Sequence, residues 1–254
     1  MTHVNTTDFI RALINARHPD SAPLVPEKIR TATVMPSSYG YPIQFSLVLG
    51  SYGVYLKLMI DDFNTLVIRG ARLILRSARL DDVMELFRLV SESREELAKW
   101  LPWIEFVRSV EDERHIVEQW IYEMQLRSAI HLCVTRDWKI VGLVGTHQID
   151  WINQRTSVRY WMGTNYVGQH YTTESTAVLL NFLFENLRLH RVFIQAATEN
   201  EPSNRVIKRL GFRWEGLLRE NERIKDRFFD HNIYGMTQND FAGLKESHSV
   251  YLGR

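Results

Sequence analysis

The chain has 254 residues, 45% of them hydrophobic, and its 31 basic and 30 acidic side chains leave a formal net charge of +1. This composition is typical of a globular protein and excludes a chain that is disordered throughout. A net charge so close to zero creates no overall field that would attract nucleic acid or an anionic membrane surface. We therefore expect no direct binding of nucleic acid.

The chain contains one cysteine, Cys133, which cannot form an internal disulfide or begin a thiolate zinc site. It lies in the alternating run IHLCV without a histidine or acidic partner at a recognisable spacing, so we expect a small core side chain. The nine histidines show no metal-ligand spacing, and no metal site is predicted. No apolar run is long enough to cross a bilayer, and Arg11 and Arg17 interrupt the first one, unlike in a signal peptide. We expect a cytoplasmic protein.

Residues 1–69 differ in pattern from the rest of the chain, and we interpret them as an N-terminal extension. A short helical pattern around residues 9–16 is followed by a dense group of prolines, which argues against regular structure. Alternating apolar and polar residues over 43–60, around Gly50 and Gly53, suggest a hairpin. The extension could be an accessory lid, an oligomer contact or a loosely ordered segment.

After Gly70 the pattern becomes regular. Residues 73–80 read as a strand and residues 81–90 as a helix whose first turn is acidic, which suits the helix dipole. A further helix is predicted, followed by three strand-like runs that are separated by short turns and indicate an antiparallel meander. The helix covers 110–127, and the three strands cover 130–135, 140–149 and 156–162.

The second half continues with a predicted helix over residues 173–187, whose apolar positions recur at helical spacing and should pack on the sheet. A short buried strand over 192–197 precedes a helix over 200–210. Gly211 follows that helix as the usual left-handed C-cap. Residues 212–224 and 228–236 are predicted to form a final hairpin.

The segment YVGQHYTTE, from Tyr166 to Glu174, stands between a predicted strand and a long apolar helix. The first N–H groups of a helix have no intrahelical partner and lie at the positive end of its dipole, so this segment is a candidate cradle for a phosphate group. Taken alone, the same residues also describe an ordinary turn and N-cap.

Further segments give this loop a family context. They are the strand YWMG at 160–163, the run TENEPSNRVIKRLGF at 198–212, WLPW at 100–103 and a charged C-terminal hairpin ending in NIYGM. Together they resemble the GNAT acetyltransferases, and the chain looks most like the RimJ/RimL branch, the ribosomal-protein-serine/alanine N-acetyltransferases. The resemblance covers about residues 70–241 and leaves 242–254 as a C-terminal tail. It implies an α+β GNAT fold, a mixed and mostly antiparallel twisted sheet flanked by helices.

The resemblance implies acetyl-CoA as co-substrate. In this family the strand before the cradle pairs with the pantetheine arm, the cradle holds the pyrophosphate, and the asparagine and serine of the N-x-x-S helix start lie near the thioester. The residues implied to bind the cofactor are Trp161, Met162, Gly163, Val167, Gly168, Gln169, His170, Tyr171, Thr172, Thr173, Asn200 and Ser203.

The cradle departs from the family pattern of Gly-x-Gly, because Gly168 is kept and His170 stands where a second glycine is usual. The Cβ of His170 restricts how closely a phosphate can approach the backbone. The side chain could instead donate a hydrogen bond to phosphate, or it could be an ordinary loop histidine.

The resemblance also implies two catalytic residues. Ser203 would protonate the departing thiolate, and Glu222 would act as general base for the incoming amine, which attacks the thioester directly without an acyl-enzyme. From the residues alone, Asn200 and Ser203 could simply cap a helix, and the run around Glu222 could be a solvated strand face. WLPW is either part of the acceptor wall or a packing element.

The RimL resemblance indicates the N-terminal amine of a ribosomal protein as acceptor. We expect a monomer or a homodimer. Fold and cofactor alone do not decide the acceptor. A small-molecule amine acetyltransferase, acting on antibiotics or polyamines, is the first alternative. A non-catalytic acyl-CoA-binding module is the second.

Overall fold

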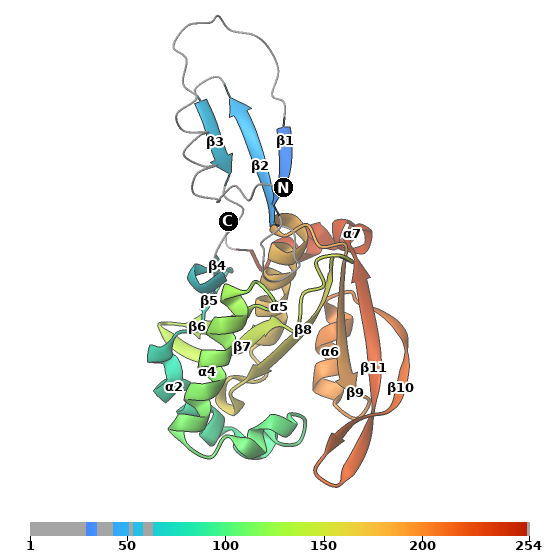
Figure 1. Ribbon diagram of the computed structural model, residues 1–254. Coiled ribbons are helices and arrows are strands. Elements are labelled where there is room, and N and C mark those ends of the chain that lie inside the picture. The colour runs from blue at the N-terminus through green and yellow to red at the C-terminus, as the bar shows by residue number, and fades with distance from the viewer. Residues whose placement is uncertain (1–28, 35–42, 51–52, 58–62, 253–254) are drawn as a thin grey trace, which may run out of the picture. The chain divides into compact units, whose positions relative to one another are not determined.

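The computed structural model describes residues 29–34, 43–50, 53–57 and 63–252 of the chain (Figure 1). The chain divides into two compact units, residues 1–61 and 62–254. In the first unit, strands β1 (Ile29–Val34), β2 (Ile43–Gly50) and β3 (Gly53–Lys57) form an antiparallel sheet in that order. Gly50 lies opposite Gly53, in the segment where the sequence predicts a hairpin. The helical pattern at residues 9–16 lies outside the described residues.

The second unit is built on a mixed, mostly antiparallel sheet, as expected from the sequence. Within residues 63–252 the sheet has eight strands in the order β10-β11-β9-β8-β7-β6-β5-β4, and only β8 and β9 run parallel. The strands are β4 (Val67–Arg69), β5 (Ile74–Ser77), β6 (His131–Arg136), β7 (Lys139–Thr146), β8 (Arg155–Met162), β9 (Arg191–Ala197), β10 (Arg213–Ile224) and β11 (Arg227–Thr237).

Helices flank this sheet (Figure 1). The α-helices are α2 (Val83–Glu92), α3 (Arg94–Leu97), α4 (Val110–Gln125), α5 (Tyr171–Asn181), α6 (Glu201–Arg209) and α7 (Gln238–Ser249). Short 3-10 turns lie at η1 (Phe63–Thr65), η2 (Leu80–Asp82), η3 (Pro102–Phe106) and η4 (Thr164–Tyr166), and α5 continues into a π-helical turn at η5 (Phe182–Asn186).

Two hydrophobic clusters fill the space between the sheet and the helices. Successive side chains of a strand point to opposite faces, and β6 follows this rule. Leu132 and Val134 join the cluster that includes α5, whereas Cys133 joins the cluster that includes α2 and α4. Cys133 is fully buried, and burial raises the pKa of its thiol, which confirms the expected core role.

Most predicted elements are found close to their predicted bounds, and the three strands of the meander pair antiparallel. Gly211 has a φ of +83° at the end of α6, as the predicted left-handed C-cap requires. The sequence did not predict α7, which crosses the expected domain end at residue 241. Its Phe241 is buried and stacks on Phe184 with ring centroids 4.8 Å apart.

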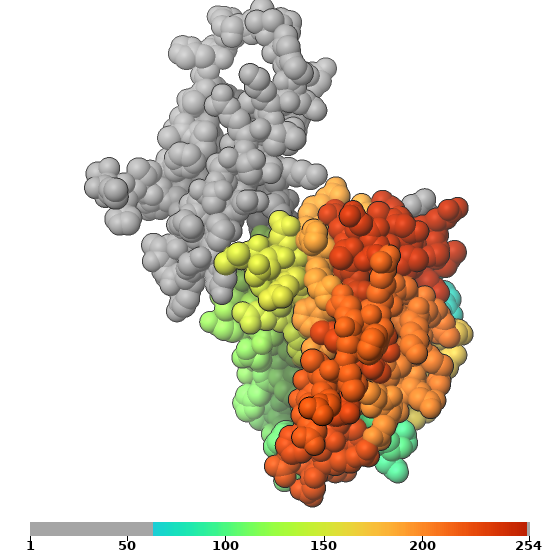
Figure 2. Space-filling model, turned by 90° about the vertical axis from the view of Figure 1, so that its right-hand side faces the viewer, coloured from blue at the N-terminus to red at the C-terminus, as the bar shows by residue number. Residues whose placement is uncertain are grey.

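Strands β8 and β9 pair over only three residues. Arg155 to Ser157 face Arg191 to Phe193, and beyond Ser157 no described strand pairs with that edge of β8. The two strands therefore diverge toward their C-terminal ends, and the edge of β8 over residues 158–162 is open. The hairpin of β10 and β11 extends beyond this point and covers one face of the unit, with α7 at its other end (Figures 1 and 2).

Candidate active site

The loop before α5 has the conformation that the Gly-x-Gly pattern implies. Gly168 has a φ of +80° and His170 a φ of +63°, so both positions are left-handed. The N–H groups of residues 168–173 donate no hydrogen bond to any group in the described part of the chain. These donors lie at the positive end of α5, where an anionic group would be stabilised. His170 therefore adopts the backbone conformation of the missing glycine.

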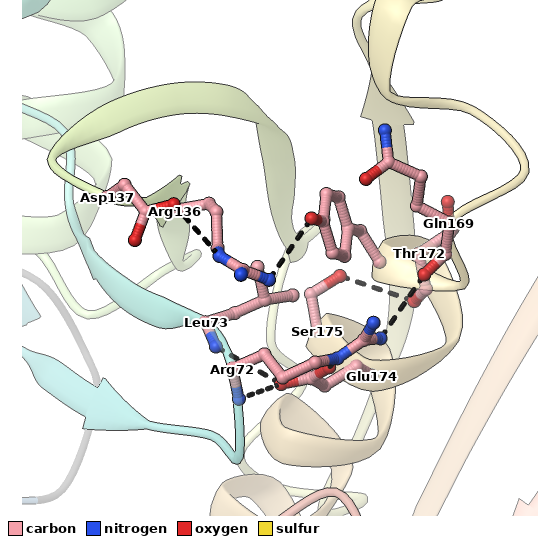
Figure 3. A network of polar contacts seen from close by, with 9 residues as sticks. Arg72, Leu73, Arg136, Asp137, Gln169, Thr172, Glu174 and Ser175 are labelled. Carbon is pink, nitrogen blue, oxygen red and sulfur yellow. Dashed lines mark hydrogen bonds and ion pairs between the residues drawn. The ribbon is translucent and has the colours of Figure 1, made fainter.

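A buried carboxylate ties the first turn of α5 to the start of β5. The side chain of Glu174 is 1% exposed and pairs with the Arg72 Nε at 2.8 Å (Figure 3). Its other oxygen accepts hydrogen bonds from the backbone N–H groups of Arg72, at 2.6 Å, and Leu73, at 3.1 Å. Arg72 also donates to the carbonyl oxygen of Gln169 at 3.2 Å, so it holds the loop as well as the helix.

Two more arginines contact this turn. Arg136, from the end of β6, donates to the hydroxyl of Tyr171 at 3.2 Å. Arg209, from the last turn of α6, lies 3.2 Å from Nδ1 of His170 and 3.4 Å from the hydroxyl of Thr173. Because an arginine can only donate, Nδ1 of His170 is the acceptor, and a neutral His170 carries its proton on Nε2. The cradle is thus surrounded by three cationic side chains.

Ser203 lies at the opening between β8 and β9. Its hydroxyl is 2.9 Å from the hydroxyl of Tyr160 on β8, and its N–H donates to the side chain of Asn200 at 3.2 Å. Asn200 is thus the N-cap of α6, as the capping interpretation predicts. Burial raises the pKa of Tyr160 to about 12, so its hydroxyl stays protonated at neutral pH.

Asn204 fixes the start of α6 in this place. Its side-chain amide donates to the carbonyl oxygens of Ala197, at 2.9 Å, and Asn200, at 2.8 Å. Its side-chain oxygen accepts from Asn232 and Tyr234 on β11. All of the hydrogen-bonding capacity of this buried amide is therefore used to join α6 to β9 and β11, which limits the movement of Ser203.

Glu222 lies on β10 next to an irregularity in its pairing with β11. One carboxylate oxygen is 3.4 Å from Nε2 of His231, and His231 faces Ala197 at the end of β9. Burial raises the pKa of Glu222 and lowers the pKa of His231. Glu222 and Ser203 thus lie on different elements beside the same end of β9, and Glu222 is partly withdrawn from water rather than on a fully solvated face.

The WLPW segment spans from β8 to the hairpin of β10 and β11. Trp103 packs against Trp161 with ring centroids 6.4 Å apart, and Trp100 meets the edge of Phe229 at 6.2 Å. A hollow of about 480 Å³ lies between Trp100 and the hairpin residues 224–227 and 229, and it begins two residues along β10 from Glu222. The segment therefore both packs on the sheet and forms one wall of a hollow.

The comparisons with known proteins agree with this geometry. The family described as "Acetyltransferase (GNAT) domain" matches residues 72–213, more than half of the chain. The chain belongs to this family. It is therefore an acyltransferase, and enzymes of this family use acetyl-CoA.

The relatives point to one branch of the GNAT family. The putative ribosomal N-acetyltransferase YdaF of Bacillus subtilis (strain 168) is 28% identical over 65% of this chain and 90% of its own length. The ribosomal-protein-serine acetyltransferase of Escherichia coli (strain K12) is 27% identical over 60% of this chain and 85% of its own length. Among solved structures, RimL in complex with coenzyme A has a TM-score of 0.66 at 25% identity and covers 68% of this chain and 98% of that one.

A self-immunity acetyltransferase, MccE, in complex with acetyl-CoA and AMP has a TM-score of 0.64 at 27% identity. The match covers 65% of this chain and 92% of that one.

The residues of this chain fit acetyl-CoA. The open edge of β8 over 158–162 can pair with an amide-bearing arm, and the free N–H groups of 168–173 can receive a pyrophosphate. No helix in the described part of the chain is long and apolar enough to cross a membrane.

Several residues of the site could not be found from the sequence. The sequence predicts Tyr160 only as part of a strand, although its hydroxyl contacts Ser203. Arg72 lies just before a predicted strand and Arg209 near the end of a predicted helix, and the partners of both are distant in the chain. The signal that could have drawn attention to Arg209 is its position in the last turn of a helix that begins near the thioester, but exposed basic residues are common there.

Proposed function

We propose that the protein acetylates the N-terminal amine of a protein, with a ribosomal protein as the acceptor, by direct attack of the amine on acetyl-CoA in a ternary complex. The observation that carries this proposal is the opening between β8 and β9, which is flanked at one end by Ser203 on α6 and by Glu222 on β10. The names of YdaF, the Escherichia coli enzyme and RimL support the choice of acceptor.

In this mechanism the open edge of β8 positions the pantetheine arm, and the N–H groups of 168–173 hold the pyrophosphate. Glu222 accepts the proton of the attacking amine, because its raised pKa makes it a better base than an exposed carboxylate. Nε2 of His231 lies 3.4 Å from its carboxylate. Ser203 donates a proton to the sulfur that leaves, Tyr160 orients the serine hydroxyl through their hydrogen bond, and the serine regains its proton from water after CoA has left.

The hollow between Trp100 and the hairpin supports a peptide acceptor. Ligand sites of about 300–1,000 Å³ hold molecules much larger than a simple amine, and this hollow of about 480 Å³ falls in that range. Its cations have acidic partners: Lys225 with Glu105 at 3.7 Å, and Arg227 with Glu199. A neutralised lining of this kind suits a polypeptide segment better than a strongly charged polyamine.

A thiol-release assay tests the proposal. Acetyl-CoA is offered with peptides that begin with serine, alanine or methionine, with the same peptides already acetylated at the N-terminus, and with a panel of aminoglycosides and polyamines. Release of CoA with free peptides, and its absence with the blocked ones, is the expected result. Turnover with the small amines alone would favour the first alternative, and binding of acetyl-CoA without any turnover would favour a non-catalytic module.

A further inference from the structure

The irregularity in the hairpin of β10 and β11 decides which residue Glu222 contacts. Leu218 lies opposite His231 and Glu222 lies opposite Phe229, so the three residues of β10 between these pairs stand against a single residue of β11. Unbroken pairing from Leu218 would instead place Glu222 opposite Arg227, four positions from His231. A bulge of this kind re-aims side chains. Here it makes Glu222 and His231 diagonal neighbours across the two strands.

Asp230 lies opposite the bulge and next to His231. Its carboxylate accepts a hydrogen bond from the N–H of Glu220 at 2.7 Å, and Glu220 has a left-handed φ of +49°. The charge of Asp230 favours a protonated imidazole, but burial outweighs it, and the pKa of His231 is lowered. His231 is therefore a neutral imidazole at neutral pH.

The position of the proton on His231 follows from Asn221, the last residue of the bulge. The side-chain nitrogen of Asn221 lies 3.3 Å from Nδ1 of His231 and 3.3 Å from Oε1 of Gln195. An amide nitrogen can only donate, so Nδ1 is an acceptor and the neutral ring carries its proton on Nε2. This buried N–H donates no hydrogen bond to any group in the described part of the chain, although Oε2 of Glu222 is 3.4 Å away.

We propose that His231 is a positioning residue whose Nε2–H holds the carboxylate of Glu222 when the acceptor amine is bound. The inference rests on the proposed function, which assigns Glu222 as the general base. A buried N–H without an acceptor is unfavourable, and catalytic hydrogen bonds often shorten only in the complex with substrate. One oxygen of Glu222 then accepts from His231, and the other takes the proton of the amine as its nitrogen bonds to the acetyl carbon. His231 neither gains nor loses a proton.

A matched pair of substitutions tests this role in the thiol-release assay. The side-chain nitrogen of a glutamine can take the place of Nε2, whereas an asparagine side chain reaches only as far as Nδ1. We expect His231→Gln to keep most of the activity. His231→Asn should lower kcat about tenfold, as for the loss of a hydrogen bond to a charged group. The KM for acetyl-CoA should stay nearly unchanged in both, because the N–H groups of 168–173 remain.

The pH profile separates a positioning role from a structural one. A donor to the charged carboxylate lowers the pKa of Glu222 and so opposes the effect of burial, which raises it. The carboxylate must be ionised to act as a base, so loss of the donor in His231→Asn should move the acidic limb of kcat/KM to higher pH. His231→Gln should leave the limb in place. In a Glu222→Gln enzyme, His231→Asn should not lower kcat further.

Asn221→Ala provides a second variant at an exposed position, where the fold is not at risk. It removes the group that fixes the proton on Nε2, so kcat should fall while thermal unfolding is unchanged. Equal losses in His231→Gln and His231→Asn, an unmoved limb in His231→Asn, or an unchanged kcat in Asn221→Ala would overturn the inference and leave the proposed function intact. A full rate in Glu222→Gln, or no release of CoA by the wild type with any acceptor, would overturn the proposed function together with it.

Discussion

The hydroxyl of Tyr160 lies 2.9 Å from the hydroxyl of Ser203 and 3.4 Å from its carbonyl oxygen, so hydrogen bonding joins β8 to α6 across the opening between the diverging strands. The two residues are 43 positions apart in the chain. Because burial raises the pKa of Tyr160 to about 12, the phenol is a stable donor, and the serine hydroxyl can direct its own proton toward a leaving group. This pair is the basis of the first two predictions.

Ser203→Ala should lower kcat by about 10²-fold, the lower range for loss of a general acid, because the departing thiolate then lacks its proton donor. The affinity for acetyl-CoA should stay nearly unchanged, since the cradle N–H groups and the edge of β8 remain. Steady-state kinetics and a binding titration check the two halves of this expectation. An unaltered kcat would exclude Ser203 as the acid.

Tyr160→Phe should have a smaller effect, a loss in kcat of about two- to tenfold, as for one net hydrogen bond. The change orients Ser203 less well but removes no reacting group. If Tyr160 had only a structural role, Tyr160→Phe would reduce kcat by the same factor in the wild type and in a Ser203→Ala enzyme. We expect instead that Tyr160→Phe has no further effect on a Ser203→Ala enzyme, which a double-mutant cycle measures. Additive losses would contradict a role of Tyr160 that acts through Ser203.

Glu222→Gln should reduce kcat/KM by 10² to 10⁴-fold, the usual range for a general base. Burial raises the pKa of Glu222 above its ordinary value of 4.5, so the acidic limb of the wild-type pH profile should lie above that pH, with activity lost as the carboxylate is protonated. The limb should be absent from the residual activity of Glu222→Gln. Glu220→Gln, an exposed neighbour on the same strand, should keep both the rate and the limb. A limb that persists in Glu222→Gln would assign it to another group.

The elements of the fold could be predicted because their signals are local. Alternation over residues 130–162 is enough to indicate a meander, and Gly211 after a helical pattern indicates its left-handed end. Helix α7 escaped prediction because its pattern is mixed and its stability comes from contacts such as Phe241 on Phe184, far away in the chain.

The candidate site was predictable only as far as the family resemblance reached. That resemblance implies the roles of Ser203 and Glu222, and the structure adds the residues that contact them. The contacts of Arg72 with Glu174 and of Arg209 with His170 join residues 102 and 39 positions apart. No pattern in a single sequence marks such pairs, because each partner alone resembles an ordinary surface or helix residue.

The backbone at His170 gives a prediction about stability. His170 has a φ of +63°, where a residue with a Cβ costs roughly 1 kcal/mol more than glycine. His170→Gly and His170→Ala both lose the contact with Arg209, so the difference between them isolates the backbone. We expect His170→Gly to be more stable than His170→Ala by roughly 1 kcal/mol in urea unfolding.

Gly168→Ala is the matched reference for that measurement. Gly168 has a φ of +80°, and a Cβ there would meet no atom within 4 Å, so the cost should again be backbone strain of roughly 1 kcal/mol without a clash. Equal stability of His170→Gly and His170→Ala, with a normal cost at Gly168, would mean that the loop relaxes to a different conformation when the histidine is removed.

A buried carboxylate outside the site should make the stability of this enzyme depend on pH. Glu113, in the first turn of α4, is fully buried, and neither carboxylate oxygen has a hydrogen-bond partner in the described part of the chain. Burial raises its pKa from 4.5 to about 7. The folded state therefore holds a proton that the unfolded state releases above pH 4.5, so stability should be full below that pH and be lost as pH rises through about 7.

Glu113→Gln removes this titration. The free energy of unfolding of the wild type should fall by roughly 3 kcal/mol relative to Glu113→Gln between pH 4.5 and pH 8, at about 1.4 kcal/mol for each pKa unit. Burial also lowers the pKa of His131 to about 4, but that contribution is common to both proteins and cancels in the comparison. Glu118→Gln, on the exposed side of the same helix, should show the same pH dependence of the free energy of unfolding as the wild type. Parallel curves for the wild type and Glu113→Gln, measured by urea unfolding across this pH range, would show that Glu113 reaches water or a partner in solution.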